Sequence, residues 1–324
     1  MANWFTQLND FSIDVLLLIV VILLKLFMAH FLPILTKNEP LQFFNWYCQQ
    51  LASKVNKSNN SISQQHISGF IAVLITFLPL SIILWLFEDF IAVTWLWHAI
   101  LLYLAIGNFK LSLASKAISQ SLSLKQNHLA KQTLKPWILR NVDNLSTMGI
   151  AKTTIEMQLL RYLQNYLLIA FYFLSVGALS ALLIKLAIMM HYCWNTKLNK
   201  YHHFGHFISL VVTLVQWLPN RIFTLMIMLT CIGNNALKNT KKLSGQWFNL
   251  NNNIVIHSLA LSLNIQLAGV AMYNDVKLRR KSFNDNGNQP QTSDILAANK
   301  VILHIFYFLL ALTILTAITT LLIH

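Results

Sequence analysis

Acidic residues are scarce in this sequence. The 324 residues include 10 Asp and Glu against 24 Lys and Arg, and only 10% are charged. Soluble domains carry about 25% charged residues. Magnesium prefers several hard carboxylate oxygens, so no magnesium cage is evident in a chain with so few acids.

Paired cysteines and the common catalytic motifs are also missing. Cys48, Cys193 and Cys231 are scattered, and no CxxC occurs, which excludes a disulfide framework or a zinc ribbon. The sequence has no GxxxxGK[ST], GxGxxG, HExxH or GxSxG, the patterns of nucleotide, dinucleotide, zinc-protease and hydrolase sites. No cofactor, no metal and no catalytic residue are therefore predicted.

Apolar residues, in contrast, are abundant. They make up 56% of the chain, against about 45–50% in soluble domains. A membrane-spanning helix needs about 20 apolar residues, and six segments approach or exceed that length: 12–35, 67–87, 91–109, 166–190, 207–233 and 301–323. These predict an all-α polytopic membrane helical bundle of about six spans, a single integral membrane domain over 1–324. The N-terminus lacks a basic n-region and a clear cleavage site, so the first segment is expected to be a retained span.

Basic residues lie mainly in alternate loops. Three Lys fall in 36–66, eight Lys and Arg in 108–161, and seven in 234–298, whereas only Lys197 and Lys200 fall in the opposite loops. Because cytoplasmic loops are enriched in Lys and Arg, this predicts that the basic loops are cytoplasmic and that both termini lie on the outer side of the membrane. Anionic lipid head groups explain the net charge of +14 without nucleic acid, which is not an expected partner.

Two inter-span segments have their own patterns. Apolar and basic residues alternate through 108–161, which predicts cytoplasmic amphipathic helices on the membrane surface. Polar residues with Gly287 and Pro290 fill 282–298, which predicts a flexible linker before a last span over 300–323.

Three cations interrupt the apolar segments: Lys25, Lys185 and Arg221. A charge at the centre of a membrane costs about 2.5–3.5 kcal/mol on insertion scales and usually marks a functional site. The alternative for the two lysines is that each reaches the membrane interface along its flexible stem. Pro219 is predicted to break the helix and to free carbonyls that Arg221, or an anion beside it, could use.

The loop HYCWNTKLNKYHHFGH gathers possible metal ligands. His203 and His206 have a spacing compatible with one helix face, and His202 adds a third imidazole. No acid or cysteine pair supports a metal, so the three are weak candidates, and an aromatic and histidine belt at the head groups is the alternative.

Glu156 and Asn165 flank Arg161 in TTIEMQLLRYLQN. Glu156 lies five residues from Arg161, a poor helical spacing, whereas Asn165 lies four residues away and can reach it. The alternative is a polar helix start at the membrane surface.

Three stretches carry a family resemblance: RYLQN at 161–165, IAFYFL after it, and KYHHFGHFISLVVTLVQWLPNRIFTL at 200–225. The Gln-Asn pair, the double histidine and W-x-P-x-R resemble the AmpE family, inner-membrane proteins of the ampicillinase regulatory locus. That family belongs to the superfamily of CobD/CbiB, the adenosylcobinamide-phosphate synthase of cobalamin biosynthesis. The resemblance extends over most of the chain and is specific around 156–225.

The resemblance implies both kept and lost positions. Phe204, Gly205, Trp217, Pro219 and Arg221 match the synthase pattern. Its polar and acidic positions carry other residues here: Gln164, Leu168, Ile188, Met189, His191, Val212, Thr213 and Gln216. A leucine position of the pattern falls on Met190. Nucleotide-driven amide formation needs magnesium held by carboxylates, so the resemblance implies a scaffold without the metal chemistry.

The leading functional prediction is a non-catalytic AmpE-like sensor or signalling regulator in the response to β-lactams and cell-wall damage. We expect Arg221 and Lys185, with Asn165, Gln164 and Trp217, to line a site for an anionic ligand that shifts a conformational equilibrium. The alternatives are a diverged adenosylcobinamide-phosphate synthase-type enzyme and a transporter of anionic cell-wall fragments.

Overall fold

The computed structural model describes residues 10–31, 41–57, 59–107, 110–230, 243, 247, 251–273 and 276–323. Its internal contacts divide the chain into two compact units. The first unit comprises Met1–Asn108, Gln164–Val215 and Leu309–His324, and the second comprises Phe109–Leu163 and Gln216–Phe308. The prediction of one domain over 1–324 does not anticipate this division, because each unit joins segments that are far apart in sequence.

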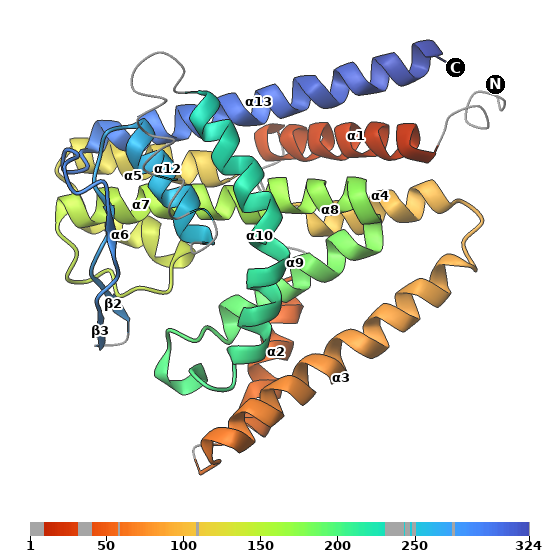
Figure 1. The fold of residues 1–324 in the computed structure, drawn as a ribbon, viewed down its shortest axis with the longest axis horizontal. Coiled ribbons are helices and arrows are strands. Elements are labelled where there is room, and N and C mark those ends of the chain that lie inside the picture. Colours follow the sequence, from red (N-terminus) through yellow and green to blue (C-terminus); the bar gives the residue numbers. More distant parts are fainter. Residues whose placement is uncertain are drawn as a thin grey trace. The chain divides into compact units, whose positions relative to one another are not determined.

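Helices build the first unit. They are α1 (Asp10–Phe31), α2 (Gln42–Val55), α3 (Ile62–Glu88), α4 (Thr94–Ala105), α8 (Leu168–Val176) and α9 (Ala178–Cys193), with a short 3₁₀ turn at Asn199–Tyr201. α4 packs against both α1 and α9, and α8 folds back along α9 (Figure 1). Two longer helices, α10 (His206–Leu229) and α13 (Thr292–Ile323), contribute residues to both units.

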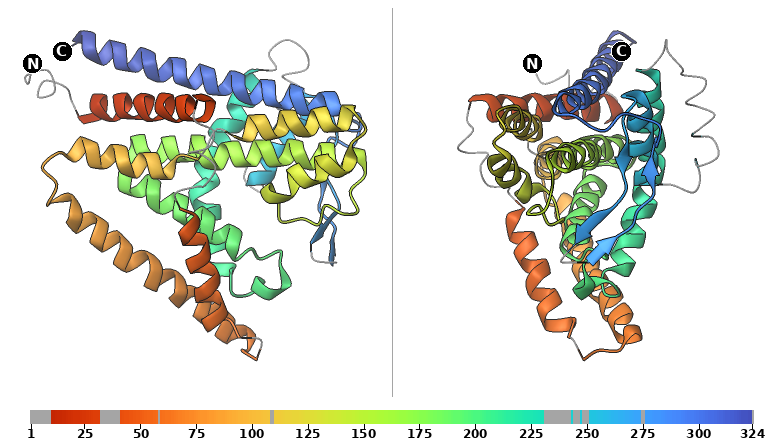
Figure 2. Two further views of the ribbon diagram at one scale, coloured as in Figure 1. Left: turned by 180° about the vertical axis from the view of Figure 1, so that it is seen from behind. Right: turned by 90° about the vertical axis from the view of Figure 1, so that its left-hand side faces the viewer.

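The second unit combines helices with two small sheets. Its helices are α5 (Leu111–Ser123), α6 (Asn127–Leu134), the 3₁₀ turn Lys135–Trp137, α7 (Thr147–Tyr162) and α12 (Asn252–Ser262). β1 (Leu267–Ala268) pairs antiparallel with β4 (Ser282–Phe283), and β2 (Ala271–Tyr273) pairs antiparallel with β3 (Val276–Leu278). α5 lies along α7, as both views in Figure 2 show.

Helix starts follow from local capping. At α3, the Ser61 side chain accepts the Gln64 backbone N–H, and the Gln64 side chain accepts the Ser61 N–H, which is a complete capping box. At α7, the Ser146 hydroxyl accepts the Gly149 N–H. Both caps satisfy first-turn donors that the helix itself leaves unpaired.

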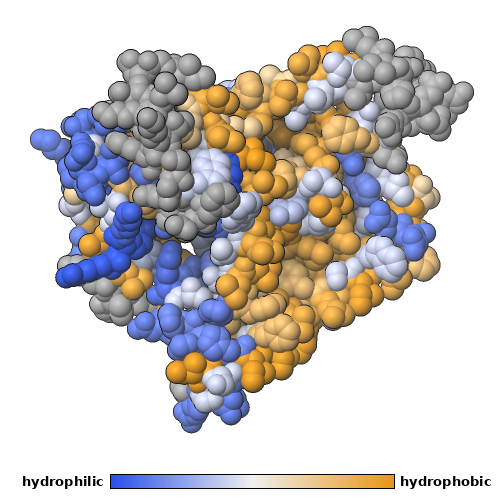
Figure 3. All heavy atoms as spheres, in the orientation of Figure 1, coloured by the Kyte–Doolittle hydropathy of each residue, from blue (hydrophilic) through white to orange (hydrophobic). Residues whose placement is uncertain are grey.

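Five described helices are long and apolar enough to cross a membrane: Phe11–Phe31, Ile62–Glu88, Thr147–Val176, His206–Leu229 and Thr292–Thr319. This confirms the predicted all-α polytopic membrane bundle. Along α3, only the small residues Gly69, Ala72, Val73 and Thr76 are buried, a narrow face that permits close helix packing. Most of its other apolar side chains are exposed and form a hydrophobic surface at the lower right of Figure 3, as a lipid-facing helix requires.

Two of the six predicted spans are wrong. The third, over 91–109, contains α4 of only 12 residues, which is too short to span a bilayer. The fourth, over 166–190, is broken at Gly177, whose φ of +116° ends α8 and lets α9 turn back. Hydropathy cannot detect such a reversal, because apolar residues continue on both sides of it.

The fourth spanning helix runs instead over Thr147–Val176. It joins α7 to α8 through a π-helical turn, Leu163–Leu167. Sequence hydropathy missed it because α7 carries Lys152, Glu156 and Arg161. Much of this helix is covered by protein, which lets polar side chains lie within it.

The stretch predicted as a linker over 282–298 is partly regular structure. Ser282 and Phe283 form β4, the Asn288 N–H donates to the Asn264 carbonyl at 2.9 Å, and α13 begins at Thr292. The last helix therefore starts earlier than the predicted span over 300–323. The region 108–161 contains α5, α6 and α7, helical as predicted. However, α7 belongs to the fourth spanning helix and is not a surface helix. The cytoplasmic side of α5 and α6 stays a prediction.

Candidate functional site

All three predicted intramembrane cations are buried. Lys25 and Lys185 are each 5% exposed and Arg221 is 4% exposed. Protein therefore covers both lysine side chains, which disfavours the alternative that each reaches the membrane interface. Lys25 and Lys185 belong to the first unit and Arg221 to the second, so each unit has its own buried cationic site.

The π-helical turn Leu163–Leu167 presents two polar residues within the first unit. Its Asn165 side-chain oxygen accepts a hydrogen bond from Lys185 Nζ on α9 at 2.9 Å. The neighbouring Gln164 Oε1 accepts the Tyr192 hydroxyl at 2.5 Å. A π-turn inserts one residue into a helix and is often found at functional sites. Here it lets consecutive amides face α9, as the predicted grouping of Gln164, Asn165 and Lys185 requires.

Lys25 reaches the same place from α1. Its Nζ donates to the Ile106 carbonyl, at the end of α4, and lies 4.5 Å from the centre of the Tyr103 ring. The next residue, Gly107, donates its N–H to the Asn165 backbone carbonyl at 3.2 Å. A Cβ on Gly107 would lie 2.8 Å from Asn165 Cβ, so only glycine permits this contact. Lys25 and Lys185 thus converge on Asn165 and its neighbours.

Arg221 is held by carbonyl oxygens in the second unit. It donates through Nη1 to the Trp217 carbonyl at 2.8 Å and through Nη2 to the Trp247 carbonyl at 2.7 Å. Its guanidinium also lies 4.1 Å from the centre of the Trp217 ring, a cation–π contact. Trp217 and Arg221 therefore contact each other directly, because the motif W-x-P-x-R places them four residues apart on one helix.

The predicted helix break at Pro219 is wrong. α10 continues from His206 to Leu229 with Pro219 inside it. Proline lacks an N–H, so the carbonyl of Val215, four residues earlier, loses its helical partner. The Tyr172 hydroxyl on α8 donates to that carbonyl at 3.0 Å. A side chain from another helix thus satisfies the freed group, which allows a proline inside a membrane helix.

Tyr172→Phe is expected to destabilise the protein by about 1 kcal/mol, because it leaves the Val215 carbonyl without its donor. Pro219→Ala restores a backbone N–H at that point, so Tyr172→Phe should cost less in the Pro219→Ala background. Thermal unfolding of the four variants in detergent measures this coupling. Equal losses in both backgrounds would mean that the hydroxyl does not substitute for the missing helical bond.

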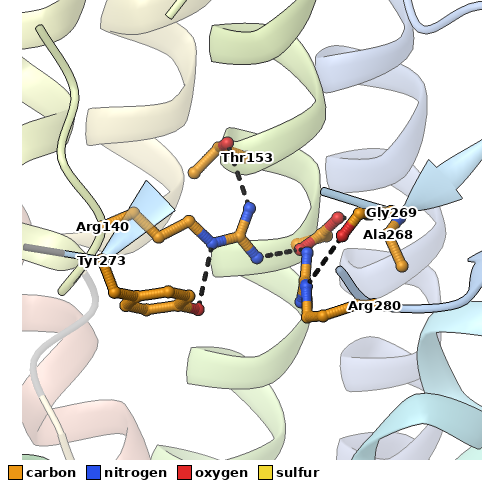
Figure 4. A network of polar contacts seen from close by, with 7 residues as sticks. Arg140, Thr153, Ala268, Gly269, Tyr273 and Arg280 are labelled. Atoms are coloured by element: carbon orange, nitrogen blue, oxygen red, sulfur yellow. Dashed lines mark hydrogen bonds and ion pairs between the residues drawn. The ribbon is translucent and has the colours of Figure 1, made fainter. Parts of the chain in front are cut away.

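Glu156 binds Arg140, Arg280 and the Ala268 backbone N–H in the second unit. Figure 4 shows the network that these residues form with Thr153, Gly269 and Tyr273. The Glu156 carboxylate accepts hydrogen bonds from Arg140, from Arg280 at 3.2 Å and from the Ala268 backbone N–H at 2.9 Å. Burial alone lowers the pKa of Arg140, but the Glu156 carboxylate and the Tyr273 hydroxyl raise it above its ordinary value. The guanidinium therefore stays charged. The network ties α7 to the segment before it and to the β1–β4 sheet.

Sequence reasoning missed this network. It paired Arg161 with Asn165, whereas Arg161 Nη2 donates to the Trp137 carbonyl at 3.1 Å and Asn165 binds Lys185. The partners of Glu156 lie far away in the sequence, 16 residues away at Arg140 and 124 residues away at Arg280. No local spacing rule connects them.

The histidines of the 191–206 loop gain a neighbour from α3. The His66 ring lies 5.0 Å from that of His206 and 5.3 Å from that of His203, while His202 Nδ1 is 2.9 Å from the Thr196 carbonyl. His206 begins α10 and His203 precedes it, so the two do not share a helix face as predicted. Within the residues that the structure describes, no three His, Cys, Asp or Glu side chains are placed to hold a metal ion.

The structure brings together several positions at which this chain departs from the synthase pattern. Leu168, Ile188, Met190 and Val212 are all buried in one apolar cluster of the first unit, together with Trp194 and other side chains. Thr213, next to Val212, is exposed. Of these, Leu168 and Val212 stand where the resemblance implied an aspartate, so the cluster supplies no carboxylate at either position.

These features define a class: a polytopic membrane protein whose buried cations are bonded to amides and carbonyls inside the helix bundle. Comparison with known proteins then gives the family. The model for the CobD/Cbib protein family matches residues 18–302, and the chain belongs to that family. The match includes α4, α7 to α10, and all three buried cations.

Relatives agree with this assignment. The cobalamin biosynthesis protein CobD of Stutzerimonas stutzeri is 23% identical over 259 residues, 80% of this chain and 84% of the relative. That of Chromobacterium violaceum is 27% identical over 173 residues, 53% of this chain and 55% of the relative. That of Leptospira interrogans is 25% identical over 207 residues, 60% and 66% of the two chains. No solved structure matches the chain significantly. The predicted superfamily is confirmed, and the finer AmpE resemblance stays a prediction.

Proposed function

We propose that this protein is a diverged synthase-type protein of cobalamin biosynthesis that binds an anionic corrinoid precursor within the membrane bundle. The observation that carries the proposal is the family match over 18–302, which includes both lysines of the π-turn site. The buried cations support an anionic ligand, because an anion offsets the cost of burying positive charge. Gln164, Asn165 and Lys185 contribute to this binding in the first unit, and Trp217 and Arg221 contribute in the second.

Turnover by the purified protein tests the proposal. The full chain is incubated in detergent with adenosylcobyric acid, an aminopropanol substrate, a nucleotide and magnesium, and the amide product is measured by mass spectrometry. We expect the unaltered protein to form product. Lys185→Met and Arg221→Ala should reduce product formation, whereas the exposed-site control Lys54→Met should preserve it. If the folded protein shows no turnover and binds no corrinoid, the proposal is refuted.

A second candidate is the non-catalytic AmpE-like sensor or signalling regulator. The observation that favours it is the apolar cluster that contains Leu168 and Val212, because these two positions lack the carboxylates that the resemblance implies for a synthase. This candidate would be supported if the protein mediates β-lactamase induction independently of corrinoids and if a normally expressed Arg221→Ala variant loses that induction. Unchanged induction in that variant would remove the role given to Arg221.

The orientation in the membrane belongs to the same proposal. The predicted orientation, with 36–66, 108–161 and 234–298 all cytoplasmic and a periplasmic N-terminus, required a span over 91–109, but α4 is too short to cross and leaves only α3 between 36–66 and 108–146. We therefore place 108–146, which carries more basic residues than 36–66, on the cytoplasmic side of a bacterial inner membrane, in contact with anionic head groups. Reporter fusions to residues in 108–161 and to the loop with Lys197 and Lys200 test this. A transporter of anionic fragments remains the third alternative, and flux in proteoliposomes would identify it.

A further inference from the structure

We infer that Cys48 and Cys193 form a thiol–disulfide redox site, in which Cys193 attacks a disulfide oxidant and Cys48 then closes an internal disulfide between α2 and α9. The oxidant is a protein or a small molecule that itself carries a disulfide. The inference goes beyond the proposed function, because it requires neither a corrinoid nor the buried cations. It concerns the first unit alone, to which both cysteines belong.

The packing of α2 against α9 brings the two cysteines together (Figure 1). Cys193 is the last residue of α9, and the next residue, Trp194, donates its indole N–H to the backbone carbonyl of Cys48 at 3.0 Å. Both side chains pack in the apolar cluster of the first unit, where Cys48 is fully buried and Cys193 is partly exposed. Both are free thiols, and they share a hydrogen bond.

This pair has no signature in the sequence. Redox cysteines are usually recognised by a CxxC spacing, whereas Cys48 and Cys193 come from different helices that are far apart in the chain. A disulfide can form only where two cysteine side chains point toward each other. The shared hydrogen bond between the thiols provides that arrangement.

The surroundings give the two thiols opposite acidities. The hydrogen bond with Cys193 and burial both raise the pKa of Cys48, so this thiol keeps its proton. The hydrogen bond from Cys48 lowers the pKa of Cys193, and the charge of Lys200 lowers it further, against the opposing effect of burial. The thiolate is the form of cysteine that attacks a disulfide. Cys193 is therefore the nucleophile, and Cys48 is the thiol that reacts second.

The loop between α9 and α10 holds the cation near the pair. Lys200 lies in the 3₁₀ turn Asn199–Tyr201, and its backbone carbonyl accepts the Asn56 side-chain N–H, just after α2, at 2.8 Å. This bond fixes the loop beside the end of α2. Cys193 ends α9, where the partial negative charge of a helix terminus disfavours a thiolate. The Lys200 ammonium group acts against that effect.

The reaction is a balanced thiol–disulfide exchange. The Cys193 thiolate attacks one sulfur of the oxidant, whose S–S bond breaks, and the other oxidant sulfur leaves and takes up a proton. Cys48 then gives up its proton and attacks Cys193 Sγ in the mixed disulfide, which releases the second oxidant sulfur as a thiol. The cysteines lose two electrons, and the oxidant becomes two thiols. The form that predominates follows the redox state of the compartment that the pair faces.

Oxidation of the purified, full-length protein tests the inference. The protein is incubated in detergent with glutathione disulfide, quenched with acid, alkylated during denaturation and digested, and linked peptides are identified by mass spectrometry. We expect a Cys48–Cys193 cross-link that dithiothreitol removes. The cross-linked protein should melt about 5 °C above the reduced protein, because the bond restricts the unfolded chain. Cys231→Ser is the matched control and should give the same cross-link and the same shift.

Single variants identify the role of each residue. In Cys48→Ala, Cys193 should retain glutathione as a stable mixed disulfide, because the second thiol is missing. In Cys193→Ala, Cys48 should react about tenfold more slowly or less, because it is buried and protonated. Lys200→Gln should slow the first step about threefold, since one exposed cation has a small effect. Lys54→Gln, which removes an exposed lysine of α2, should leave the rate unchanged.

Two results would overturn the inference. One is the absence of a Cys48–Cys193 cross-link in the folded, unaltered protein after exposure to glutathione disulfide. The other is equal reactivity of the remaining cysteine in folded Cys48→Ala and Cys193→Ala, which would remove the order of attack. Corrinoid binding and turnover are judged separately, because those assays contain no disulfide oxidant.

Discussion

Glu156→Gln should lower the free energy of unfolding by about 3–5 kcal/mol, the usual cost of removing one partner from a buried ion pair. Glu156 is almost fully buried and accepts hydrogen bonds from Arg140, Arg280 and the Ala268 N–H. Glutamine keeps the shape of the side chain but removes the charge, and its amide offers only one acceptor oxygen. Two guanidinium groups would then lie close together without their shared anion.

The structural consequence should appear first at β1. Ala268 has a φ of +60°, an uncommon conformation for a residue other than glycine, and its N–H is held by Glu156 at 2.9 Å. Hydrogen exchange should therefore increase at β1 and β4 in Glu156→Gln before the rest of the second unit responds. Thermal unfolding in detergent, with SDS titration as a second measure, gives the global loss.

An exposed carboxylate provides the control. Asp143→Asn lies in the same unit on the surface and should change stability by less than about 0.5 kcal/mol. A triple variant, Glu156→Leu with Arg140→Met and Arg280→Met, removes all three charges and should recover much of the loss, because buried ion networks often contribute little beyond apolar packing. A loss in Glu156→Gln no larger than that in Asp143→Asn would mean that the network does not hold the second unit together.

Composition and hydropathy were enough to predict the membrane bundle. Long apolar helices such as α1, α3 and α13 can be recognised from hydropathy, because each contains a long stretch of apolar residues with few charges. α7 does not, since Glu156 and Arg161 lower its hydropathy while protein covers it. The reversal at Gly177 was also hidden, because it depends on one positive φ and not on a change in composition.

The sequence indicated which residues are unusual but not which of them meet. Lys25, Lys185 and Arg221 are recognisable as charges within apolar segments, and all three are buried as a functional reading requires. The sequence grouped Arg221 with Lys185, whereas the contacts join Lys185 to Lys25 through Asn165 and Gly107. That grouping depends on a π-turn and on the end of α4, neither of which has a spacing signature.

Gly205→Ala is expected to be among the most damaging small substitutions in the first unit. A Cβ at this position would lie 1.9 Å from the backbone oxygen of Trp194, far inside van der Waals contact. The obstacle is backbone and not a flexible side-chain end, so the loop between α9 and α10 would have to move as a whole. Overpacking commonly costs about 1–3 kcal/mol and occasionally more, and we expect at least the upper part of this range.

The loop cannot move freely, because Trp194 is anchored on both sides. Its indole Nε1 donates to the Cys48 carbonyl on α2 at 3.0 Å, and its ring packs edge-on against Phe204 at 4.7 Å. Gly69 of α3 also contacts this loop closely, since an added Cβ at Gly69 would lie 2.0 Å from the Phe204 carbonyl oxygen. Gly69→Ala should therefore destabilise the protein similarly. The two losses should not add, because either variant displaces the same loop.

Gly149→Ala is the matched control, a glycine in α7 whose added Cβ would meet only side-chain atoms at 3.3 Å and beyond. Its melting temperature should change little, because alanine favours the helix and the neighbouring side chains can adjust. Melting curves of the three variants separate the two kinds of glycine. If Gly205→Ala and Gly69→Ala melt like Gly149→Ala, the packing of α3 on the loop is looser than the structure shows. If both melt early, the Phe204-Gly205 pair of the family motif is explained by packing, because glycine alone lets the loop close over Trp194.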